Sequence, residues 1–434
     1  MGVNKRCCRL ACLKAGKTVL DPGGSCMKDF FKVTALEKVL EFRSLFRRTE
    51  EETVGLECCH GRILARDIYS DQDLPDFSRS TMDGYAVAAS STFGASDGSP
   101  AFLAVKGSVS MGEQPVFSLK HGEAAKISTG GMLPWGADSV VMIEYTDAVD
   151  DESLEVYKSV APGQNIVEKG EDFEKGALLL EKGRIIRPQD AGLLAAFGFT
   201  GVPVYRKPRI AVVSTGDEVV PVSETPPPGH IRDINSHTLF GLVLEAGAIP
   251  LAFGIVKDNE KDLYAVCKQA LGETDMVMIS GGSSVGVRDY TTNVLTSFPD
   301  SRLLVHGISI SPGKPTLLAD VSGKAVWGLP GHVVSAMVVF DRVVKPFIRA
   351  ISGCLDEDDA FALPAVLSRN VASAQGREEY IRVKLMRNHD GWLAEPVLGK
   401  SGMINTMVRA DGMIRIPLNT EGLEKGSRVM VARL

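Results

Sequence analysis

The sequence of 434 residues lacks the cysteine spacing that structural metal sites use. Its eight cysteines include no CxxC pair and its seven histidines are scattered, which argues against a zinc or iron–sulfur site. Half of the cysteines fall in residues 1–26, a segment without a long apolar run or a small-residue cleavage site, so a secretory signal peptide is not indicated. We expect residues 1–26 to be a disordered extension, with Met27 as an alternative start, and the chain to be cytoplasmic.

The chain also lacks a net positive charge and long apolar runs. A net charge of −6 argues against nucleic acid or an anionic membrane as the main partner. No apolar stretch approaches the ~20 residues that a membrane-spanning helix needs. Two nucleotide-binding motifs are missing as well: "GISISPGKP" has the wrong glycine spacing for a Walker A loop, and "GGSSVG" lacks the GxGxxG pattern. A P-loop or a Rossmann site is therefore excluded.

The composition, with 44% hydrophobic and 24% charged residues, is typical of a globular protein, and the length of 434 residues suggests roughly three domains. The apolar spacing predicts a helix from Met27 to about Phe46 and a second helical segment over 55–65, followed by an extended connector over 70–77. In the first helix the residues expected to share one face are Val33, Leu36, Val39, Leu40 and Phe46.

Short strands separated by Gly, Ser and Asp then dominate between about 80 and 172, which predicts a small β-domain. Helical character returns at 188–199, with Pro near its start and Gly near its end. We therefore expect a discontinuous helical and extended domain I (27–72 and 173–207). A small β-domain II (73–172) is inserted into it.

The chain changes character again at 208. Four apolar runs, each followed by a loop with Gly, Ser or Asp, alternate with helical patterns at about 236–247, 260–271, 289–297 and 332–350. This order predicts an α/β domain III (208–354) with a parallel sheet, whose ligands bind beyond the carboxyl ends of the strands. An acidic linker leads into a C-terminal, barrel-like β-domain IV (355–434). The fold class is thus multidomain α/β plus β.

The loops at the expected strand ends carry residues suited to phosphate and to a metal ion. Backbone N–H groups and a lysine would hold the phosphate, while Glu218, Asp258 and Asp289 could share magnesium through oxygen ligands. Lys314 could equally be a solvated surface charge, and Asp217 or Glu218 could cap a helix. The candidate ligand-binding residues are Ser214, Thr215, Gly216, Asp217, Gly281, Gly282, Ser283, Ser284, Gly286, Gly313, Lys314, Pro330 and Gly331.

Seven stretches, in this order, resemble one family: "STMDGYAV", "ISTGGMLPWGADSVV", "KGEDFEKG", "VVSTGDEVV", "ISGGSSVGVRDY", "SPGKP" and "GLPGH". The sequence is similar, from Met27 to Leu434, to the molybdopterin molybdenumtransferases, which include bacterial MoeA and the E domain of gephyrin. The resemblance implies insertion of molybdate into adenylylated molybdopterin with release of AMP, and magnesium as the ion. It also implies a homodimer with a shared active site. Molybdopterin adenylyltransferase and molybdoenzymes or their chaperones would be further partners.

The same resemblance suggests catalytic residues, and it leaves two alternatives open. Where the family has Pro after the LPG turn and its next residue, this sequence has Val333, so we expect a looser turn. The alternatives are an adenylyltransferase acting on molybdopterin and a non-catalytic scaffold like gephyrin. The β-domain and C-terminal module argue against the first, and the retained acids argue against the second. The residues that the resemblance marks as catalytic are Asp83, Thr129, Asp172, Glu218, Asp258 and Asp289.

Overall fold

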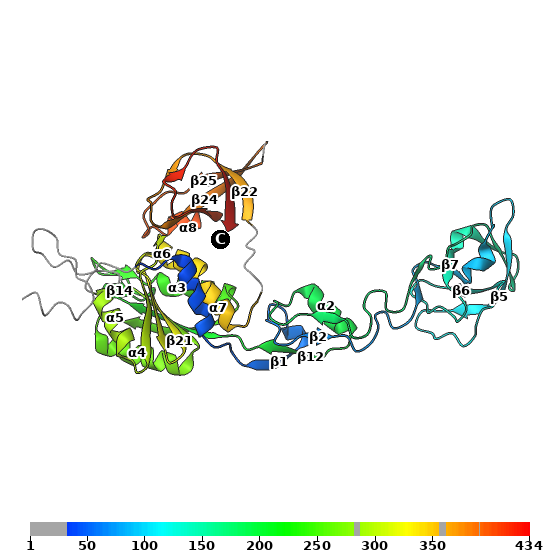
Figure 1. Cartoon of the computed structure of the whole chain (residues 1–434), viewed down its shortest axis with the longest axis horizontal. Coiled ribbons are helices and arrows are strands. Elements are labelled where there is room, and N and C mark those ends of the chain that lie inside the picture. Colours follow the sequence, from blue (N-terminus) through cyan, green and yellow to red (C-terminus); the bar gives the residue numbers. More distant parts are fainter. Residues whose placement is uncertain (1–32, 282–286, 356–361, 390) are drawn as a thin grey trace, which may run out of the picture. The chain divides into compact units, whose positions relative to one another are not determined.

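The computed structural model describes residues 33–281, 287–355, 362–389 and 391–434, and all side chains among them except those of 287–289. The chain divides into two compact units. Unit 1 comprises Met1–Glu52, Gly61–Ala65 and Val204–Leu434, and unit 2 comprises Thr53–His60 and Arg66–Pro203 (Figure 1). The finer division into four domains stays a prediction. None of the helices in the described ranges is long and apolar enough to cross a membrane.

Unit 1 is built on a six-stranded sheet in which four neighbouring strands are parallel. The last two strands run antiparallel to their neighbours, which the sequence had not indicated. The parallel core confirms the expected α/β arrangement. In spatial order the strands are β16 (Ile249–Val256), β13 (Arg209–Thr215), β17 (Met276–Ser280), β21 (Lys324–Leu329), β20 (Leu317–Val321) and β18 (Ser301–His306).

Helices cover both faces of this sheet (Figure 1). Alternate side chains of β13 enter two different cores: Ile210 and Val212 pack with α3, α6 and α7, whereas Ala211 and Val213 pack with α4 and α5. Burial on both faces explains why the strands read as continuous apolar runs in the sequence. The helices are α3 (Asn235–Glu245), α4 (Glu260–Glu273), α5 (Val287–Ser297), α6 (Val333–Val339) and α7 (Lys345–Ile351).

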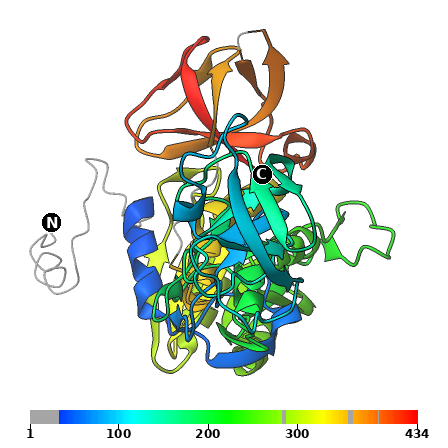
Figure 2. The same cartoon turned by 90° about the vertical axis from the view of Figure 1, so that its right-hand side faces the viewer.

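The C-terminal strands form a closed five-stranded barrel, because β24 pairs with both β25 and β26. The orange and red strands of the barrel stand above the α/β layers in Figure 2. The short β19 (Ile310–Ser311) pairs with β24 and so joins the barrel to the α/β layers. The barrel strands are β22 (Ala362–Leu367), β24 (Glu378–Asn388), β25 (Gly391–Pro396), β26 (Gly412–Ile416) and β28 (Arg428–Arg433).

Two N-terminal expectations need correction. The first helix is shorter than expected within the described residues: α1 (Leu36–Glu41) continues as the 3-10 turn η2 (Phe42–Leu45), and Val33 is exposed. The helix expected over 55–65 was wrong. That stretch holds the end of β1 (Glu51–Gly55), a 3-10 turn η3 (Leu56–Cys58) and an extended segment. Gly61 has φ of 72°, a left-handed conformation that ends any helix there.

Unit 2 contains the expected small β-domain and the helix α2 (Pro188–Ala196). The domain is one six-stranded sheet in the order β7-β4-β6-β5-β9-β8. Its strands confirm the segments read from the sequence between 80 and 172. They are β4 (Gly84–Val87), β5 (Ala101–Val109), β6 (Glu123–Ile127), β7 (Ser139–Met142), β8 (Thr146–Ala148) and β9 (Ser153–Val156).

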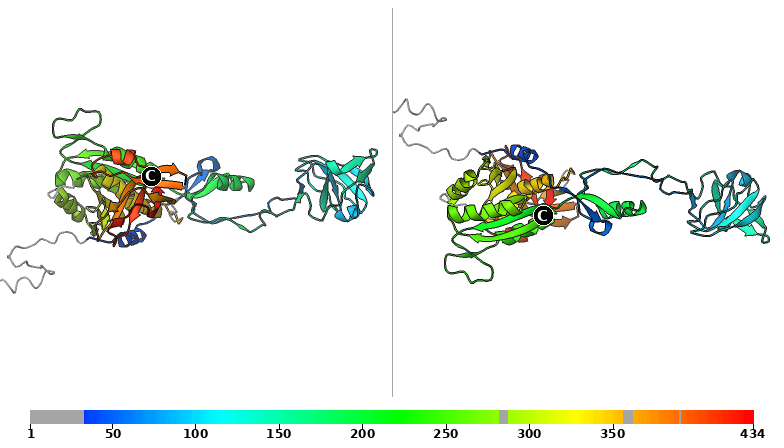
Figure 3. Two further views of the ribbon diagram at one scale, coloured as in Figure 1. Left: turned by 90° about the horizontal axis from the view of Figure 1, so that it is seen from above. Right: turned by 90° about the horizontal axis from the view of Figure 1, so that it is seen from below.

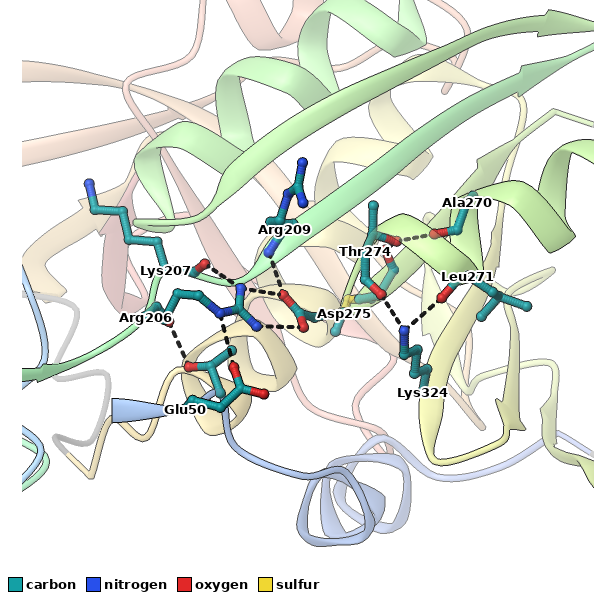
Figure 4. A network of polar contacts seen from close by, with 11 residues as sticks. Glu50, Arg206, Lys207, Arg209, Ala270, Leu271, Thr274, Asp275 and Lys324 are labelled. Atoms are coloured by element: carbon teal, nitrogen blue, oxygen red, sulfur yellow. Dashed lines mark hydrogen bonds and ion pairs between the residues drawn. The ribbon is translucent and has the colours of Figure 1, made fainter. Parts of the chain in front are cut away.

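The amino-terminal edge of the unit 1 sheet is held by a polar network centred on Arg206 (Figure 4). Its Nη1 and Nη2 donate to the two carboxylate oxygens of Asp275 at 3.0 and 2.9 Å. Nε donates to Glu50 at 3.1 Å, and the Arg209 N–H donates to Asp275 at 2.7 Å. Burial alone would raise the pKa of Asp275, but the hydrogen bonds from Arg206 and Arg209 outweigh it and hold the pKa below its usual value.

Candidate active site

The carboxyl ends of four parallel strands open onto a cavity of about 490 Å³, which we call the strand-end cavity. Strands β13, β16, β17 and β21 each deliver a loop to it, as expected for a parallel sheet. The polar residues that line it include Ser214, Thr215, Glu218, Asp258, Ser280 and His332. Gly281 and Gly331, both expected to bind ligand, line it as well.

Close approach of two loops explains one of these glycines. Gly281 has φ of 124°, and a Cβ added there would stand 2.1 Å from the carbonyl oxygen of Thr215. No other residue fits without moving the backbone, because Cβ atoms do not approach an oxygen so closely. Gly281 is therefore required by packing against the end of β13. The neighbouring Gly282, Ser283, Ser284 and Gly286 lie outside the described residues.

Two buried oxygen atoms of the strand-end cavity have no hydrogen-bond partner among the described residues. They are Thr215 Oγ1 and Asp258 Oδ1. Burial raises the pKa of the Asp258 carboxyl, and the nearby charges of Asp217 and Glu218 raise it further, while the neighbouring Thr215 hydroxyl and the contact with Asp217 oppose part of this rise. Such a carboxyl is stabilised in its charged form by a cation, and oxygen ligands suit a hard divalent ion.

These residues fit a cation but do not complete its ligand set by themselves. Within the part of the chain that the structure describes, no three His, Cys, Asp or Glu side chains group closely enough to hold a metal. Glu218 and Asp258 line one cavity. Asp289 lies near the start of α5, but its side chain is outside the description. The magnesium trio expected from the sequence thus stays a prediction.

A hydrogen-bonded cluster at the start of α3 organises the cavity wall, and the sequence analysis missed it. Asp233 is buried, and its Oδ1 accepts from Ser214 Oγ and from the Ser236 N–H, both at 3.0 Å. Asn235 Nδ2 donates to Ser280 Oγ at 2.6 Å and to the Gly331 carbonyl at 2.9 Å. The stretch "RDINS" before an amphipathic run is a helix-start signal that could have revealed these residues.

Lys314 lies elsewhere than expected. With Gly313 and Pro330 it lines a second cavity of about 430 Å³, here called the Lys314 cavity. The sequence had placed it on one surface with Glu218 and Asp258, whereas the structure assigns those acids to the strand-end cavity. The difference arises because barrel residues, which no local pattern connects to "SPGKP", form one wall of the Lys314 cavity.

The Lys314 cavity is rich in positive charge. Arg377 and Arg382 of the barrel line it, and the Nε atom of each is buried without a hydrogen-bond partner among the described residues. Arg382 is only 6% exposed, and its Nη2 donates to the Gly399 carbonyl at 3.1 Å. Glu379 is the one carboxylate among the described lining residues. The excess of positive over negative side chains in the described lining favours the binding of an anion.

His332 lines both cavities and connects the LPG turn to the barrel. Its Nδ1 lies 2.8 Å from Ser401 Oγ, and the Val334 N–H donates to the Ser401 carbonyl at 3.1 Å. Val333, where the family has proline, is the first residue of α6 and is buried. The two cavities therefore share one wall.

Asp217 and Gly216 line neither of these two cavities but a third one. They line an apolar cavity of about 730 Å³ beside α3, and neither is among the residues that line the strand-end cavity. Asp217 Oδ1 accepts the Asp258 N–H at 3.3 Å. That contact makes Asp217 a brace between two loops, whereas the cap of the following helix α4 is Asn259, whose side chain accepts the Asp262 N–H.

In unit 2 the three motif stretches lie side by side. Asp83 Oδ1 accepts the Thr129 N–H at 2.8 Å, which joins the MDGYA and TGG loops. Lys169 N–H donates to Ser78 Oγ at 3.0 Å, which joins the third stretch to the residues just before the first. Asp172 donates its N–H to the Leu74 carbonyl at 3.0 Å. Asp83, Thr129 and Asp172 are all exposed.

The comparisons with known proteins cover almost the whole chain. Family models match for the MoeA N-terminal region (domains I and II) at 33–198, a probable molybdopterin binding domain at 211–350, and the MoeA C-terminal region (domain IV) at 364–434. A Bacillus subtilis protein named molybdopterin molybdenumtransferase is 33% identical over 402 residues, covering 92% of each chain. A Nostoc protein of the same name is 33% identical over 391 residues, covering 89% of each.

Solved structures agree. The crystal structure of a molybdopterin biosynthesis MoeA protein from Pyrococcus horikosii superposes with a TM-score of 0.78 at 41% identity, covering 93% of this chain and 99% of that one. The matches to the N-terminal and C-terminal regions do not favour an adenylyltransferase, for which only the α/β domain would be expected. This chain belongs to the MoeA family of molybdopterin molybdenumtransferases, the transferases of molybdenum cofactor biosynthesis.

Proposed function

We propose that the chain inserts molybdate into adenylylated molybdopterin and releases AMP, with the phosphates of that substrate in the strand-end cavity. The observation that carries the proposal is the buried Oδ1 of Asp258 in the strand-end cavity, which lies near the Thr215 hydroxyl and beside Glu218 but forms no ion pair with the described residues. A cavity that leaves a carboxylate buried in this way is suited to a ligand that brings its own cation, and a phosphate–magnesium pair does so.

Magnesium is part of this proposal. The described lining of the strand-end cavity holds three carboxylates, Glu218, Asp233 and Asp258, against a single arginine. An anionic substrate would be repelled there unless a divalent ion offset the carboxylates. Glu218 and Asp258 would hold the ion, with Asp289 as the predicted third ligand. When bound, it would neutralise charge that develops on the phosphate oxygens. Backbone N–H groups of the loop after Gly281, which lies outside the described residues, stay the donors that the sequence predicts for the phosphate.

Molybdate fits the Lys314 cavity. It is an oxyanion, and Arg377 and Arg382 offer buried Nε–H groups that lack a partner among the described residues. Guanidinium groups bind oxyanions through paired N–H donors. Since His332 and the LPG turn form a wall common to both cavities, an oxyanion in one would lie next to the substrate in the other.

The proposal includes a homodimer with an active site shared between subunits. Asp83 and Thr129 form a fixed, exposed pair in unit 2, while the acids of the strand-end cavity belong to unit 1. Molybdopterin adenylyltransferase would supply the substrate, and molybdoenzymes or their chaperones would receive the product. Cytoplasmic location is proposed because Cys58, Cys59, Cys267 and Cys354 are free thiols, as a reducing compartment keeps them.

Purified full-length chain tests this function when it is given adenylylated molybdopterin, molybdate and magnesium. We expect AMP release that needs all three. Asp258→Asn should lower the rate roughly 10-fold or more, the usual cost of disturbing a metal site. Glu245→Gln, an exposed acid at the end of α3, is the matched control and should keep the wild-type rate. Wild-type turnover by Asp258→Asn would contradict the proposal, and so would AMP release without molybdate or magnesium.

A further inference from the structure

Arg232 is the one lysine or arginine among the described residues that line the strand-end cavity. The sequence had assigned the phosphate-binding cation to Lys314, but Lys314 lines the other cavity. The strand-end cavity therefore needs a different source of positive charge from the protein itself. Arg232 is exposed and follows Ile231 in the short strand β15 (Ile231–Arg232), directly before the buried Asp233.

The backbone on both sides of Arg232 is fixed. β15 pairs in parallel with β14 (Val219–Val220), so that Val220 stands opposite Arg232. The Ile231 N–H donates to the Glu218 carbonyl at 2.8 Å, and the Asp233 N–H donates to the Val220 carbonyl at 2.9 Å. These bonds tie Arg232 to the loop that carries Glu218, one of the proposed magnesium ligands.

The guanidinium is fixed as well, through one of its three nitrogens. Arg232 Nε donates to the carbonyls of Val222 and Glu224, both at 3.1 Å. These carbonyls belong to the segment between β14 and β15, which projects from the α/β layers in Figure 3. The Nη1 and Nη2 groups of Arg232 make no hydrogen bond to the described residues. The side chain is thus held in place with two donor groups left for a ligand.

A simpler role would be to brace the projecting segment alone. Nε already serves that role, and a brace need not stand in the wall of a cavity. A guanidinium held by its Nε loses little freedom when Nη1 and Nη2 then bind a phosphate in a two-pronged contact. Because three carboxylates line the same cavity, the positive charge of Arg232 would reduce their repulsion of an incoming anion.

We propose that Arg232 binds the phosphate of the AMP portion of the substrate and holds it through Nη1 and Nη2. This inference rests on the proposed function and deepens it, because it names the residue that recognises the nucleotide phosphate. It predicts that Arg232 contributes to the binding of AMP but not to the binding of adenosine, which has no phosphate.

The test compares AMP with adenosine on the full-length chain by calorimetry, with magnesium present in every titration. In Arg232→Gln, Kd for AMP should rise about 10-fold or more, since hydrogen bonds to charged groups are the strong ones. Kd for adenosine should stay within about twofold, because no charged contact is lost. Arg232→Lys should recover part of the AMP affinity, since it keeps the charge but not the fork. Arg302→Gln, an exposed arginine of β18, is the control and should change neither value.

Each other outcome has a distinct meaning. Equal weakening of AMP and adenosine in Arg232→Gln would show that Arg232 only braces the projecting segment, and the inference would be wrong. Unchanged AMP binding would overturn it as well. Failure of the wild-type chain to bind either compound would reject the proposed function itself, and the inference with it. Unfolding curves of each variant would establish that the fold is kept.

Discussion

Replacing Arg206 with glutamine removes the centre of the network at the amino-terminal edge of the sheet. Asp275 would keep only the Arg209 N–H and would lose both guanidinium bonds. The side chains of Arg206 and Asp275 are 31% and 26% exposed, between a surface pair and a buried one. Surface pairs contribute up to about 1 kcal/mol and broken buried pairs cost about 3–5 kcal/mol. We expect Arg206→Gln to lower the free energy of unfolding by about 2 kcal/mol at neutral pH.

The unfolding free energy lost in Arg206→Gln should become smaller as the pH falls. The pKa of Asp275 is lowered in the folded chain, so its stabilisation is complete above the unfolded value and is lost as pH falls through the folded one. The difference between wild type and Arg206→Gln should therefore be constant between about pH 7 and about pH 5 and shrink below about pH 4.

Trp327 makes the measurement specific to unit 1. It is fully buried in the α/β core, with its ring 4.9 Å from that of Phe347. The other two tryptophans, Trp135 and Trp392, are exposed and can be replaced by phenylalanine so that fluorescence reports only Trp327. In urea, 2 kcal/mol would lower the unfolding midpoint by about 1 M if m is about 2 kcal/mol/M.

Arg302→Gln is the matched control for this prediction. Arg302 pairs with Asp320 at 3.6 Å on the same sheet, but its side chain is 62% exposed. Its loss should cost less than about 0.5 kcal/mol. Equal effects of the two variants would refute the reasoning from burial. A difference between wild type and Arg206→Gln that stays the same from neutral to acid pH would refute the role assigned to Asp275.

Two further predictions concern the active site. Mixing inactive Asp83→Asn chains with inactive Asp289→Asn chains should restore AMP release if each site uses Asp83 from one subunit and Asp289 from the other; verified heterodimers without activity would reject the shared site. Gly281→Ala should abolish most AMP release, because the added Cβ would stand 2.1 Å from the Thr215 carbonyl oxygen and move the loop. Gly272→Ala, in an open position on α4, is the control and should not change the rate. Normal activity of Gly281→Ala would show that the turn tolerates displacement.

The parallel sheet could be predicted because its strands are buried on both faces. Each strand is a continuous apolar run that stops at a Gly, Ser or Asp, and parallel order then places the loops at one edge. Ser214, Glu218, Asp258 and Gly281 accordingly line one cavity. The same logic could not separate Lys314 from the acids, because Arg377 and Arg382, which complete its cavity, come from a barrel more than sixty residues later in the chain.

Arg232 and Asp233 were missed for a different reason. They stand before a helix rather than at the end of a strand of the parallel sheet, and the Pro-rich segment ahead of them reads as an ordinary loop. Their role depends on hydrogen bonds to Val222, Glu224 and Ser214, which periodicity does not report. The helix expected over 55–65 shows the opposite error, since a helical apolar spacing was overridden by the left-handed conformation of Gly61.

The interrupted order of unit 1 has a consequence for synthesis of the chain. Phe46 packs with its ring 5.8 Å from that of Phe347, so the N-terminal segment of unit 1 completes its core only with residues made about three hundred positions later. Unit 2, by contrast, falls entirely between 53 and 203, a range that only Gly61–Ala65 of unit 1 interrupts. On the ribosome, unit 2 can therefore fold while Leu36, Val39 and Phe46 still expose their apolar side chains. Chaperone binding to a nascent chain should accordingly concentrate on this early segment and end when α7 emerges.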